Sequence, residues 1–194
     1  YFINDMKIGS YRLKGHATKD FYRWCCTWSV NIENPKDLGF EAKYYVLPEL
    51  IEANVIIDID VIDDSFEHGL FREVGTSATS FHKEKNRTAD IRAKNCAEIA
   101  KRDSEQYLIW CDTNLEADLL KKYIPEAVEV RGSDSPQRKE QCALDFKQGK
   151  TRVLISKPKI FGYGMNFQKC HNVIFCGLTY SYENYHQALR RIYR

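Results

Sequence analysis

The hydrophobic pattern becomes regular beyond Thr88, where short apolar runs alternate with stretches of helical periodicity. The apolar runs predict β-strands at residues 107–111, 127–131, 151–156 and 172–176. Between and around them, small or apolar positions recur at helical spacing, as at Ala93, Cys96, Ala97 and Ala100. Strands that alternate with helices are typical of an α/β fold, so we expect a doubly wound, mainly parallel sheet with helices on both faces.

The helices of this region carry recognisable start and stop signals. Thr113 and Glu116 form a capping box, and Ser135, followed by a proline, is the predicted N-cap of the next helix. Gly149 ends that helix, and Ser181 is the predicted cap of the last one. These signals define where the helices begin and end relative to the expected strands.

Residues 1–50 are patterned differently. Thr18 is a predicted N-cap, and the helix after it has an apolar stripe that we expect to be core: Phe21, Trp24, Cys25 and Trp28. An irregular stretch with prolines follows. We therefore place a domain boundary near Leu50, which separates a helical and irregular segment at 1–50 from a domain at 51–194.

Beyond this boundary the pattern is mixed. The β-branched alternation at residues 54–61 predicts a strand. Residues 63–88 are polar, charged and weakly patterned, so we expect a loop or linker there.

Composition excludes several protein classes. Of 194 residues, 43% are hydrophobic and 29% charged, which excludes a disordered, collagen-like or membrane chain. The apolar runs are far shorter than the ~18 residues that a membrane span needs. The chain begins at Tyr1 without an initiator methionine, from which we expect a piece of a longer protein.

Charge and cysteine content bear on nucleic-acid binding, disulfide bonds and metal sites. The net charge of +2 is too balanced to indicate nucleic-acid binding, but basic residues concentrate at 82–102 and acidic ones at 58–67. The seven cysteines form no repeating pattern, which is untypical of a disulfide framework and indicates a reducing cytoplasm. Cys170, His171 and Cys176 lack the spacing of a zinc site, so no metal ligand is expected.

Ligands of a doubly wound sheet bind beyond the carboxyl ends of the strands, and the loop after the strand at 151–156 is one candidate there. Gly162 and Gly164 allow positive φ and the close approach of a phosphate or polymer. Asn166 and Gln168 present amide groups. An ordinary tight turn is the alternative interpretation.

The last helix is the other candidate. Gln187, Arg191 and Arg194 have the spacing of one helix face. A second, packing face is formed by Tyr182, Tyr185, Leu189 and Ile192. The planar fork of arginine suits bidentate contact with phosphate, so this stripe is able to supply arginine fingers to a nucleotide held elsewhere. A solvated cationic helix end is the alternative interpretation.

Groups that cradle a nucleotide are missing from the sequence. None of the ten glycines opens a phosphate loop of the form G-x-x-x-x-G-K-[ST], and no magnesium-binding acidic box follows a strand. If the chain acts on ATP, it supplies only half of the site.

Taken together, the segments resemble the second RecA-like lobe of superfamily 2 helicases, over roughly residues 54–194. The resemblance is carried by Tyr107-Leu-Ile-Trp-Cys-Asp-Thr-Asn, Ser135-Pro-Gln-Arg-Lys-Glu, Phe146-Lys-Gln-Gly, Arg152-Val-Leu-Ile-Ser, Gly162-Tyr-Gly-Met-Asn-Phe-Gln and Gln187-Ala-Leu-Arg-Arg-Ile-Tyr-Arg. The last two segments resemble motifs V and VI. Within the superfamily the chain looks most like Swi/Snf-type translocases, especially the DEAD/DEAH-box-like helicases of phages and prophages. Residues 1–50 more loosely resemble the tail of the first lobe.

The resemblance implies roles for single residues. Arg191 and Arg194 fall on the motif VI arginines that reach the γ-phosphate of ATP, with Arg194 at the finger position. The resemblance also implies that the nucleotide is contacted by Gln187, Gly162 and Gly164. Those implied at nucleic acid are Ser156, Lys157, Asn166 and Gln168. Arg190 and Phe167 depart from the family, which usually has Gly or Asp at the first position and Leu at the second.

The implied function is the C-terminal lobe of an ATP-dependent DNA helicase or translocase in the cytoplasm of a bacterial or phage-infected cell. ATP and Mg²⁺ would be held mainly by an absent N-terminal RecA-like lobe, and the other expected partner is double-stranded DNA, not a membrane. A non-catalytic nucleic-acid- or protein-binding module on the same fold is an alternative; its parent gene would encode no phosphate loop upstream of Tyr1. A small-molecule enzyme is a third possibility, disfavoured because no Ser-His-Asp or Cys-His arrangement fits the strand ends.

Overall fold

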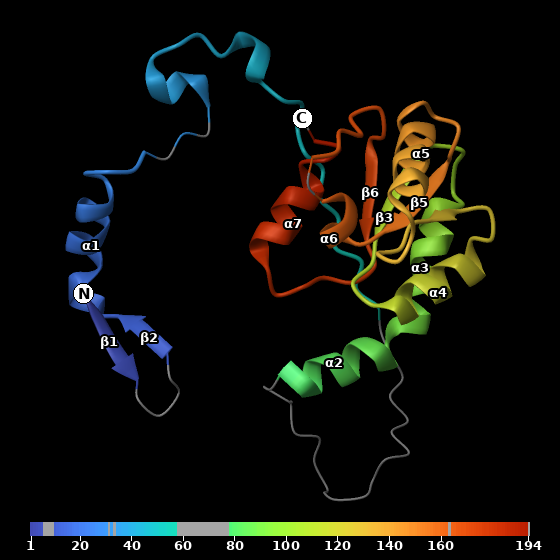
Figure 1. Cartoon of the computed structure of the whole chain (residues 1–194), viewed down its shortest axis with the longest axis horizontal. Helices are drawn as coiled ribbons and strands as arrows, with labels where there is room; N and C mark the ends of the chain where they lie inside the picture. The colour runs from blue at the N-terminus through green and yellow to red at the C-terminus, as the bar shows by residue number, and fades with distance from the viewer. Residues whose placement is uncertain (6–9, 31, 33, 58–77, 163, 194) are drawn as a thin grey trace, which may run out of the picture. The chain divides into compact units, whose positions relative to one another are not determined.

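The computed structural model describes residues 1–5, 10–30, 32, 34–57, 78–162 and 164–193 (Figure 1). The chain divides into two compact units, Tyr1–Pro48 and Glu49–Arg194.

The first unit combines a hairpin with short helices. Strands β1 (Phe2–Asp5) and β2 (Ser10–Leu13) pair antiparallel, and α1 (Thr18–Cys25) follows. The unit also has three short 3-10 helices: η1 (Gly15–Ala17), η2 (Pro35–Leu38) and η3 (Lys43–Tyr45).

Two predictions for α1 are wrong. The N-cap is Ala17, and the Thr18 hydroxyl instead donates to the Lys14 carbonyl at 3.4 Å. No residue of α1 is buried, and Trp24 and Trp28 are 49% and 64% exposed. Trp28 also lies beyond the end of α1, so only Phe21, Trp24 and Cys25 of the predicted stripe belong to the helix. Apolar spacing alone does not show whether a core covers such a stripe.

The second unit is built on a parallel sheet of four strands in the order β4-β5-β3-β6. The strands are β3 (Tyr107–Trp110), β4 (Val128–Glu129), β5 (Val153–Ser156) and β6 (Asn172–Phe175). They lie inside the four predicted ranges. The predicted strand at 54–61 is wrong where it can be checked, since residues 54–57 belong to no strand; residues 58–61 lie outside the described residues.

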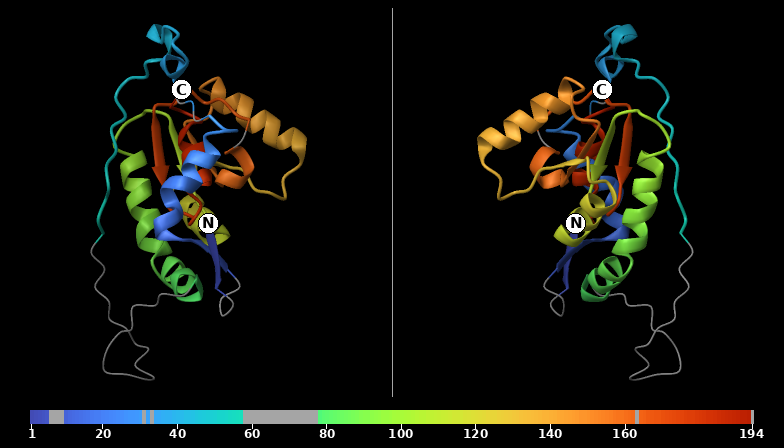
Figure 2. Two further views of the ribbon diagram at one scale, coloured as in Figure 1. Left: turned by 90° about the vertical axis from the view of Figure 1, so that its left-hand side faces the viewer. Right: turned by 90° about the vertical axis from the view of Figure 1, so that its right-hand side faces the viewer.

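Helices cover both faces of this sheet, as Figure 2 shows for α3 and α5 on opposite sides. The helices are α2 (Ala78–Arg87), α3 (Ala89–Ala100), α4 (Asn114–Tyr123), α5 (Pro136–Lys147), α6 (Pro158–Phe161) and α7 (Tyr182–Leu189). Helix α2 lies within the stretch 63–88 that was predicted to be a loop or linker, so that prediction is wrong for residues 78–87.

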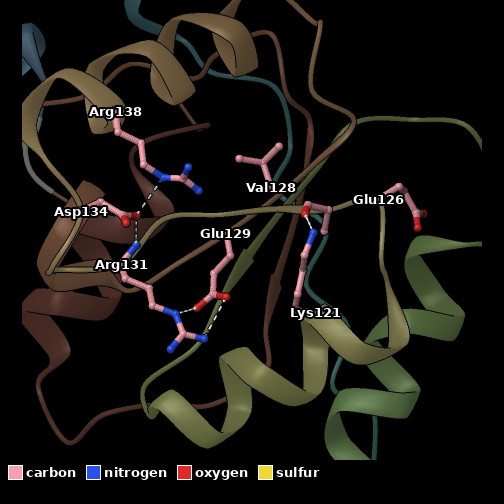
Figure 3. A pocket seen from close by; sticks show the side chains of 8 residues that line it. Lys121, Glu126, Val128, Glu129, Arg131, Asp134 and Arg138 are labelled. Atoms are coloured by element: carbon pink, nitrogen blue, oxygen red, sulfur yellow. Dashed lines mark hydrogen bonds and ion pairs between the residues drawn. The ribbon is translucent and has the colours of Figure 1, made fainter.

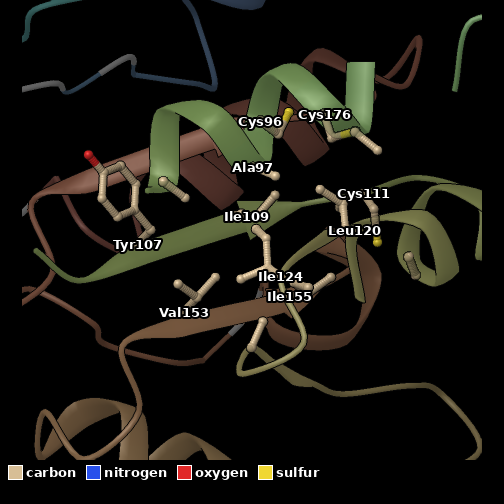
Figure 4. Close-up of a cluster of buried hydrophobic side chains, with 14 residues drawn as sticks. Cys96, Ala97, Tyr107, Ile109, Cys111, Leu120, Ile124, Val153, Ile155 and Cys176 are labelled. Carbon is tan, nitrogen blue, oxygen red and sulfur yellow. The ribbon is translucent and has the colours of Figure 1, made fainter. Parts of the chain in front are cut away.

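Successive residues of the central strands enter two different cores. On β3, Ile109 packs with α3 and α4 in the cluster of Figure 4, whereas Trp110 faces the cluster that contains Phe146 of α5 and Phe161 of α6. All four residues of β3 and of β5 are buried. A strand covered on both faces favours apolar residues at nearly every position, which explains why these strands are apolar runs rather than alternating ones. Ser156 is the polar exception, and its hydroxyl donates to the Val130 carbonyl. The predicted α/β fold class is confirmed.

The predicted caps of the second unit are confirmed. The Thr113 side chain accepts from the Glu116 backbone NH at 3.1 Å, while the Glu116 carboxylate accepts from the Thr113 NH at 3.0 Å. Ser135 and Ser181 accept from the third backbone NH after them, each at 3.2 Å. Gly149 follows α5 with φ of 80°, a left-handed conformation that favours glycine.

Among the described residues, no helix combines the length and the apolar character needed to cross a membrane.

Candidate functional site

The carboxyl ends of the four parallel strands meet at one edge of the sheet, where α/β folds bind ligands. Both candidate segments begin here, one after β5 and the other after β6.

The two glycines of the β5 loop have different reasons to be glycine. Gly164 has φ of 74°, as predicted for a left-handed position, and it is exposed. Gly162 has φ of −69°, so the prediction of positive φ does not apply to it. A Cβ on Gly162 would instead lie 2.1 Å from the Pro158 carbonyl oxygen, so the absent side chain permits a close approach of the backbone to α6.

Asn166 and Gln168 shape the same loop. The Asn166 Oδ1 accepts from the Gln168 backbone NH at 3.2 Å, and its Nδ2 donates to the Gln168 Oε1 at 3.3 Å. Between them, Phe167 is buried and its ring packs edge-on against Phe146 and Phe161, at centroid distances of 5.2 and 6.0 Å. The aromatic ring thus anchors the loop in the core, with one amide partly exposed and the other exposed at the surface.

The C-terminal segment does not continue as one helix. Helix α7 ends at Leu189, and Arg190 is its C-cap. The predicted continuous helix is therefore wrong at Arg191, although the Arg191 side chain still contacts Gln187. Arg194 lies outside the described residues, so its place on the same face stays a prediction. Of the predicted packing face, Leu189 and Ile192 are buried, Tyr185 is partly buried and Tyr182 is 75% exposed.

Arg191 joins the two candidate segments. Its side chain is buried, with Nε donating to the Gln187 carbonyl and Nη2 to the Gln187 Oε1, both at 2.9 Å. Its Nη1 donates to the Met165 carbonyl at 2.9 Å, and its own carbonyl accepts from the Phe167 NH at 2.8 Å. The expectation that Arg191 presents its guanidinium outward does not hold; the group ties α7 to the β5 loop.

A cavity of about 420 Å³ opens beside the β5 loop. It is lined in part by Cys111, Asn114, Arg131, Ser156, Lys157 and Lys159. Ser156 is buried and its hydroxyl donates to the Val130 carbonyl at 3.2 Å, whereas the Lys157 Nζ reaches Asn114 Oδ1 at 2.8 Å from a partly exposed position. Burial raises the pKa of the Cys111 thiol to about 12, which favours the neutral thiol at neutral pH.

A second pocket, of about 320 Å³, lies beside edge strand β4 (Figure 3). Its charges are paired within the protein. Arg131 contacts Glu129 at 2.5 Å and also Asp118, and hydrogen bonds with these two carboxylates raise the pKa of Arg131. Arg138 contacts Asp134 at 3.4 Å. These mutual contacts favour a structural role for this pocket.

The structure also contains a buried charged network that was not predicted. Lys85 and Arg92 belong to the basic stretch at 82–102, but they point inward and pair with Asp112 and Glu116. Glu116 was predicted only as part of a capping box. No local signal predicts these partners, because Asp112 lies 27 positions after Lys85 and Glu116 lies 24 positions after Arg92.

Residues 90–194 match the family described as "Helicase conserved C-terminal domain". Solved structures similar to this chain include the C-terminal part of the Fun30 ATPase domain, with 19% identity, a TM-score of 0.43, and coverage of 59% of this chain and 36% of that one. Another is S. cerevisiae Dbp5 bound to RNA and ADP BeF3, at 16% identity, TM-score 0.45, and coverage of 55% and 29%. A third is T4 UvsW, at 14% identity, TM-score 0.48, and coverage of 61% and 25%.

A search of curated proteins found no match. The chain spans only about a quarter to a third of the length of the similar solved structures.

Proposed function

Because the chain belongs to the family of helicase conserved C-terminal domains, we propose that it is the C-terminal RecA-like lobe of an ATP-dependent helicase or translocase. In this proposal an N-terminal lobe holds ATP and Mg²⁺, and the lobe described here completes the site from the other side. Residues 1–50 are proposed to be the tail of that N-terminal lobe. The quoted motifs further favour a Swi/Snf-type enzyme of phage or prophage origin that acts on double-stranded DNA.

The observation that carries the proposal is the contact of Arg191 with both candidate segments. Its bonds to Gln187 and to the Met165 carbonyl join the motif VI segment to the motif V loop. A helicase lobe needs such a connection, because nucleotide contacts from one segment must respond to nucleic-acid contacts from the other. Because the Arg191 guanidinium is bonded to both segments, a movement of the motif V loop would displace the motif VI segment, and the reverse.

The proposed roles are divided between the two segments. Arg194 is the finger that contacts the γ-phosphate, and Arg191 with Gln187 holds the segment that carries it. Gly162 and Gly164 give the motif V loop its shape near the nucleotide. The nucleic-acid backbone is contacted from Lys157, Asn166 and Gln168, while Ser156 supports the end of β5 through Val130.

The test is to replace Arg194 in a protein that contains both lobes. An arginine finger stabilises charge that develops on the transferring phosphoryl group, so Arg194→Ala should reduce kcat by ~10³-fold or more and leave the affinity for ATP nearly unchanged. Arg194→Lys should restore little, because an ammonium group lacks the planar fork. Steady-state ATPase kinetics and nucleotide titration measure both quantities.

Arg190→Ala is the matched control. Arg190 lies at the end of α7, where its guanidinium sits 5.3 Å from the centre of the Tyr193 ring. Arg190→Ala should therefore reduce kcat much less than Arg194→Ala does. Equal effects of the two substitutions, or no effect of Arg194→Ala, would refute the assignment of motif VI.

A further inference from the structure

The loop between β6 and α7, residues 176–181, is held by two cations, the buried Lys85 and the partly buried Arg92. Lys85 of α2 has a side chain only 8% exposed. Its Nζ donates to the Leu178 carbonyl at 2.5 Å and to the Asp112 carboxylate at 2.6 Å. One ammonium group therefore connects α2 to the loop after β3 and to the loop after β6.

Arg92 of α3 makes a parallel connection. Its Nη1 donates to Glu116 Oε1 at 2.7 Å and also to the Cys176 carbonyl. Its Nη2 donates to the Lys85 carbonyl at 2.5 Å, which links the two cations through the backbone. The carbonyls on either side of Gly177 are thus both held by cationic donors.

Glu116 completes the arrangement from α4. Its carboxylate is fully buried, and Oε2 accepts from the backbone NH groups of Asp112 at 2.7 Å and Thr113 at 3.0 Å. A Cβ on Gly177 would lie 2.4 Å from Glu116 Oε1, so the loop passes over this carboxylate at a distance that only glycine permits. Outside the network, the Phe81 ring packs on Tyr180 at 4.6 Å between centroids.

We propose that Lys85 and Arg92 are positioning residues that set the conformation of the β6–α7 loop and, through it, the placement of α7 and the motif VI arginines. This rests on the proposed function for its catalytic consequence. Buried charges are costly to desolvate and give little net stability compared with apolar packing. Their hydrogen bonds are directional, however, so they hold a loop in one conformation where apolar contacts would let it slide.

The position of the β6–α7 loop in the chain explains why its conformation would affect ATP hydrolysis. Three residues separate Leu178 from Tyr182, where α7 begins, and the end of α7 leads directly to Arg191. A shift of the loop would therefore move α7 and, with it, the arginines that follow α7. Catalytic groups that are misplaced by about 1 Å lose much of their effect on the transition state.

Hydrogen–deuterium exchange of the chain tests the loop itself. In Lys85→Met and in Arg92→Met, amides at residues 177–185 should exchange about 10-fold faster or more, while amides of α5 keep their rates. Arg92→Lys should rescue only part of the effect, because one ammonium cannot replace two guanidinium nitrogens. Lys150→Met, which removes an exposed contact to Asp145 at 3.5 Å, is the control and should leave both regions unchanged.

The double variant Lys85→Met/Asp112→Asn separates positioning from charge balance. It removes the partly buried Asp112 carboxylate that the single variant leaves without its Lys85 partner, but the Leu178 carbonyl still lacks its donor. Fast exchange confined to 177–185 should persist in the double variant. Normal exchange there, or equal acceleration in α5, would overturn the proposal.

ATPase kinetics of the two-lobe protein test the catalytic consequence. Lys85→Met and the double variant should lower kcat by about 10-fold or more with KM for ATP little changed, whereas Lys150→Met should be neutral. A loosened loop with normal kcat would overturn the positioning role. If the unaltered two-lobe protein does not hydrolyse ATP, the proposed function fails, and the exchange experiment still decides whether the two cations hold the loop.

Discussion

At the scale of single residues, Gly177 shows how one position depends on a partner far away in sequence. Its Cα passes the Glu116 carboxylate so closely that an added methyl group would lie 2.4 and 2.5 Å from the two oxygens. Glu116 cannot swing into water to make room, because it is fully buried and bonded to Arg92 and to two backbone NH groups.

We therefore predict that Gly177→Ala destabilises the chain by about 1–3 kcal/mol, the usual range for overpacking a closely packed site. Chemical denaturation followed by circular dichroism measures the free energy of unfolding. Gly132→Ala is the control, because no described heavy atom lies within 4 Å of its added Cβ and its φ is not positive. Equal losses in the two variants would show that the clash at Gly177 is relieved without cost.

Arg191 is the residue at which the expectation from sequence and the observed geometry differ most. Motif spacing placed it on an exposed cationic face, yet its side chain is buried and bonded to Gln187 and Met165. The spacing argument assumed that the helix continues, whereas α7 ends at Leu189. The spacing does place Arg191 beside Gln187, but it does not show that the β5 loop covers the guanidinium, which donates to the Met165 carbonyl.

At the scale of elements, α5 is stabilised at its start by a local signal. The Ser135 side chain accepts a hydrogen bond from the Arg138 backbone NH, which otherwise has no partner within the helix. We predict that Ser135→Ala lowers the free energy of unfolding by about 1 kcal/mol. Thermal or urea denaturation measures this loss. Ser133→Ala, an exposed position in the preceding turn, should have almost no effect, and a similar loss there would contradict the capping role.

Local chemistry explains which elements could be predicted. The capping box at Thr113, the cap at Ser135 and the left-handed Gly149 each act within a few residues, so the sequence contains everything that they require. The strands β3 and β5 could be predicted because burial on both faces favours a run of mostly apolar residues.

Elements that depend on distant partners could not be predicted in the same way. Helix α2 looks like a polar linker because its contacts, from Lys85 to Leu178 and from Phe81 to Tyr180, join residues far apart in sequence. Residues 54–57 have strand-like alternation without forming a strand, and alternation alone does not supply a neighbouring strand to pair with. In α1, periodicity indicates an apolar face but not what covers it.

At the scale of the whole molecule, the proposed two-lobe enzyme accounts for the absence of a phosphate loop from this sequence. In the proposed enzyme the nucleotide is cradled by the other lobe, and this lobe adds contacts to the γ-phosphate only. We predict that the chain alone does not hydrolyse ATP and binds it weakly. Isothermal titration calorimetry with magnesium-ATP and a phosphate-release assay check this, and micromolar affinity or turnover by the chain alone would refute the two-lobe proposal.

The proposed two-lobe arrangement also predicts how the chain alone binds nucleic acid. The proposed contacts, from Lys157, Asn166 and Gln168, are directed at the backbone rather than at base edges. Binding should therefore be weak, independent of sequence and steeply dependent on salt, because phosphate contacts release counterions. Fluorescence anisotropy with labelled duplexes at several salt concentrations measures this dependence.

Replacing Lys157 is the most specific test of the predicted salt-dependent binding. Its ammonium group is partly exposed beside the 420 Å³ cavity and is held toward it by Asn114. If it contacts one phosphate, Lys157→Ala should weaken binding to all duplexes alike and reduce the slope of log K against log salt concentration by about 0.9. Lys150→Ala removes the same charge from a residue whose side chain is 66% exposed and contacts Asp145, and it should leave the slope unchanged. A complex that is specific for one sequence and insensitive to salt would instead indicate a dedicated binding module, because base-edge contacts, unlike phosphate contacts, carry sequence information.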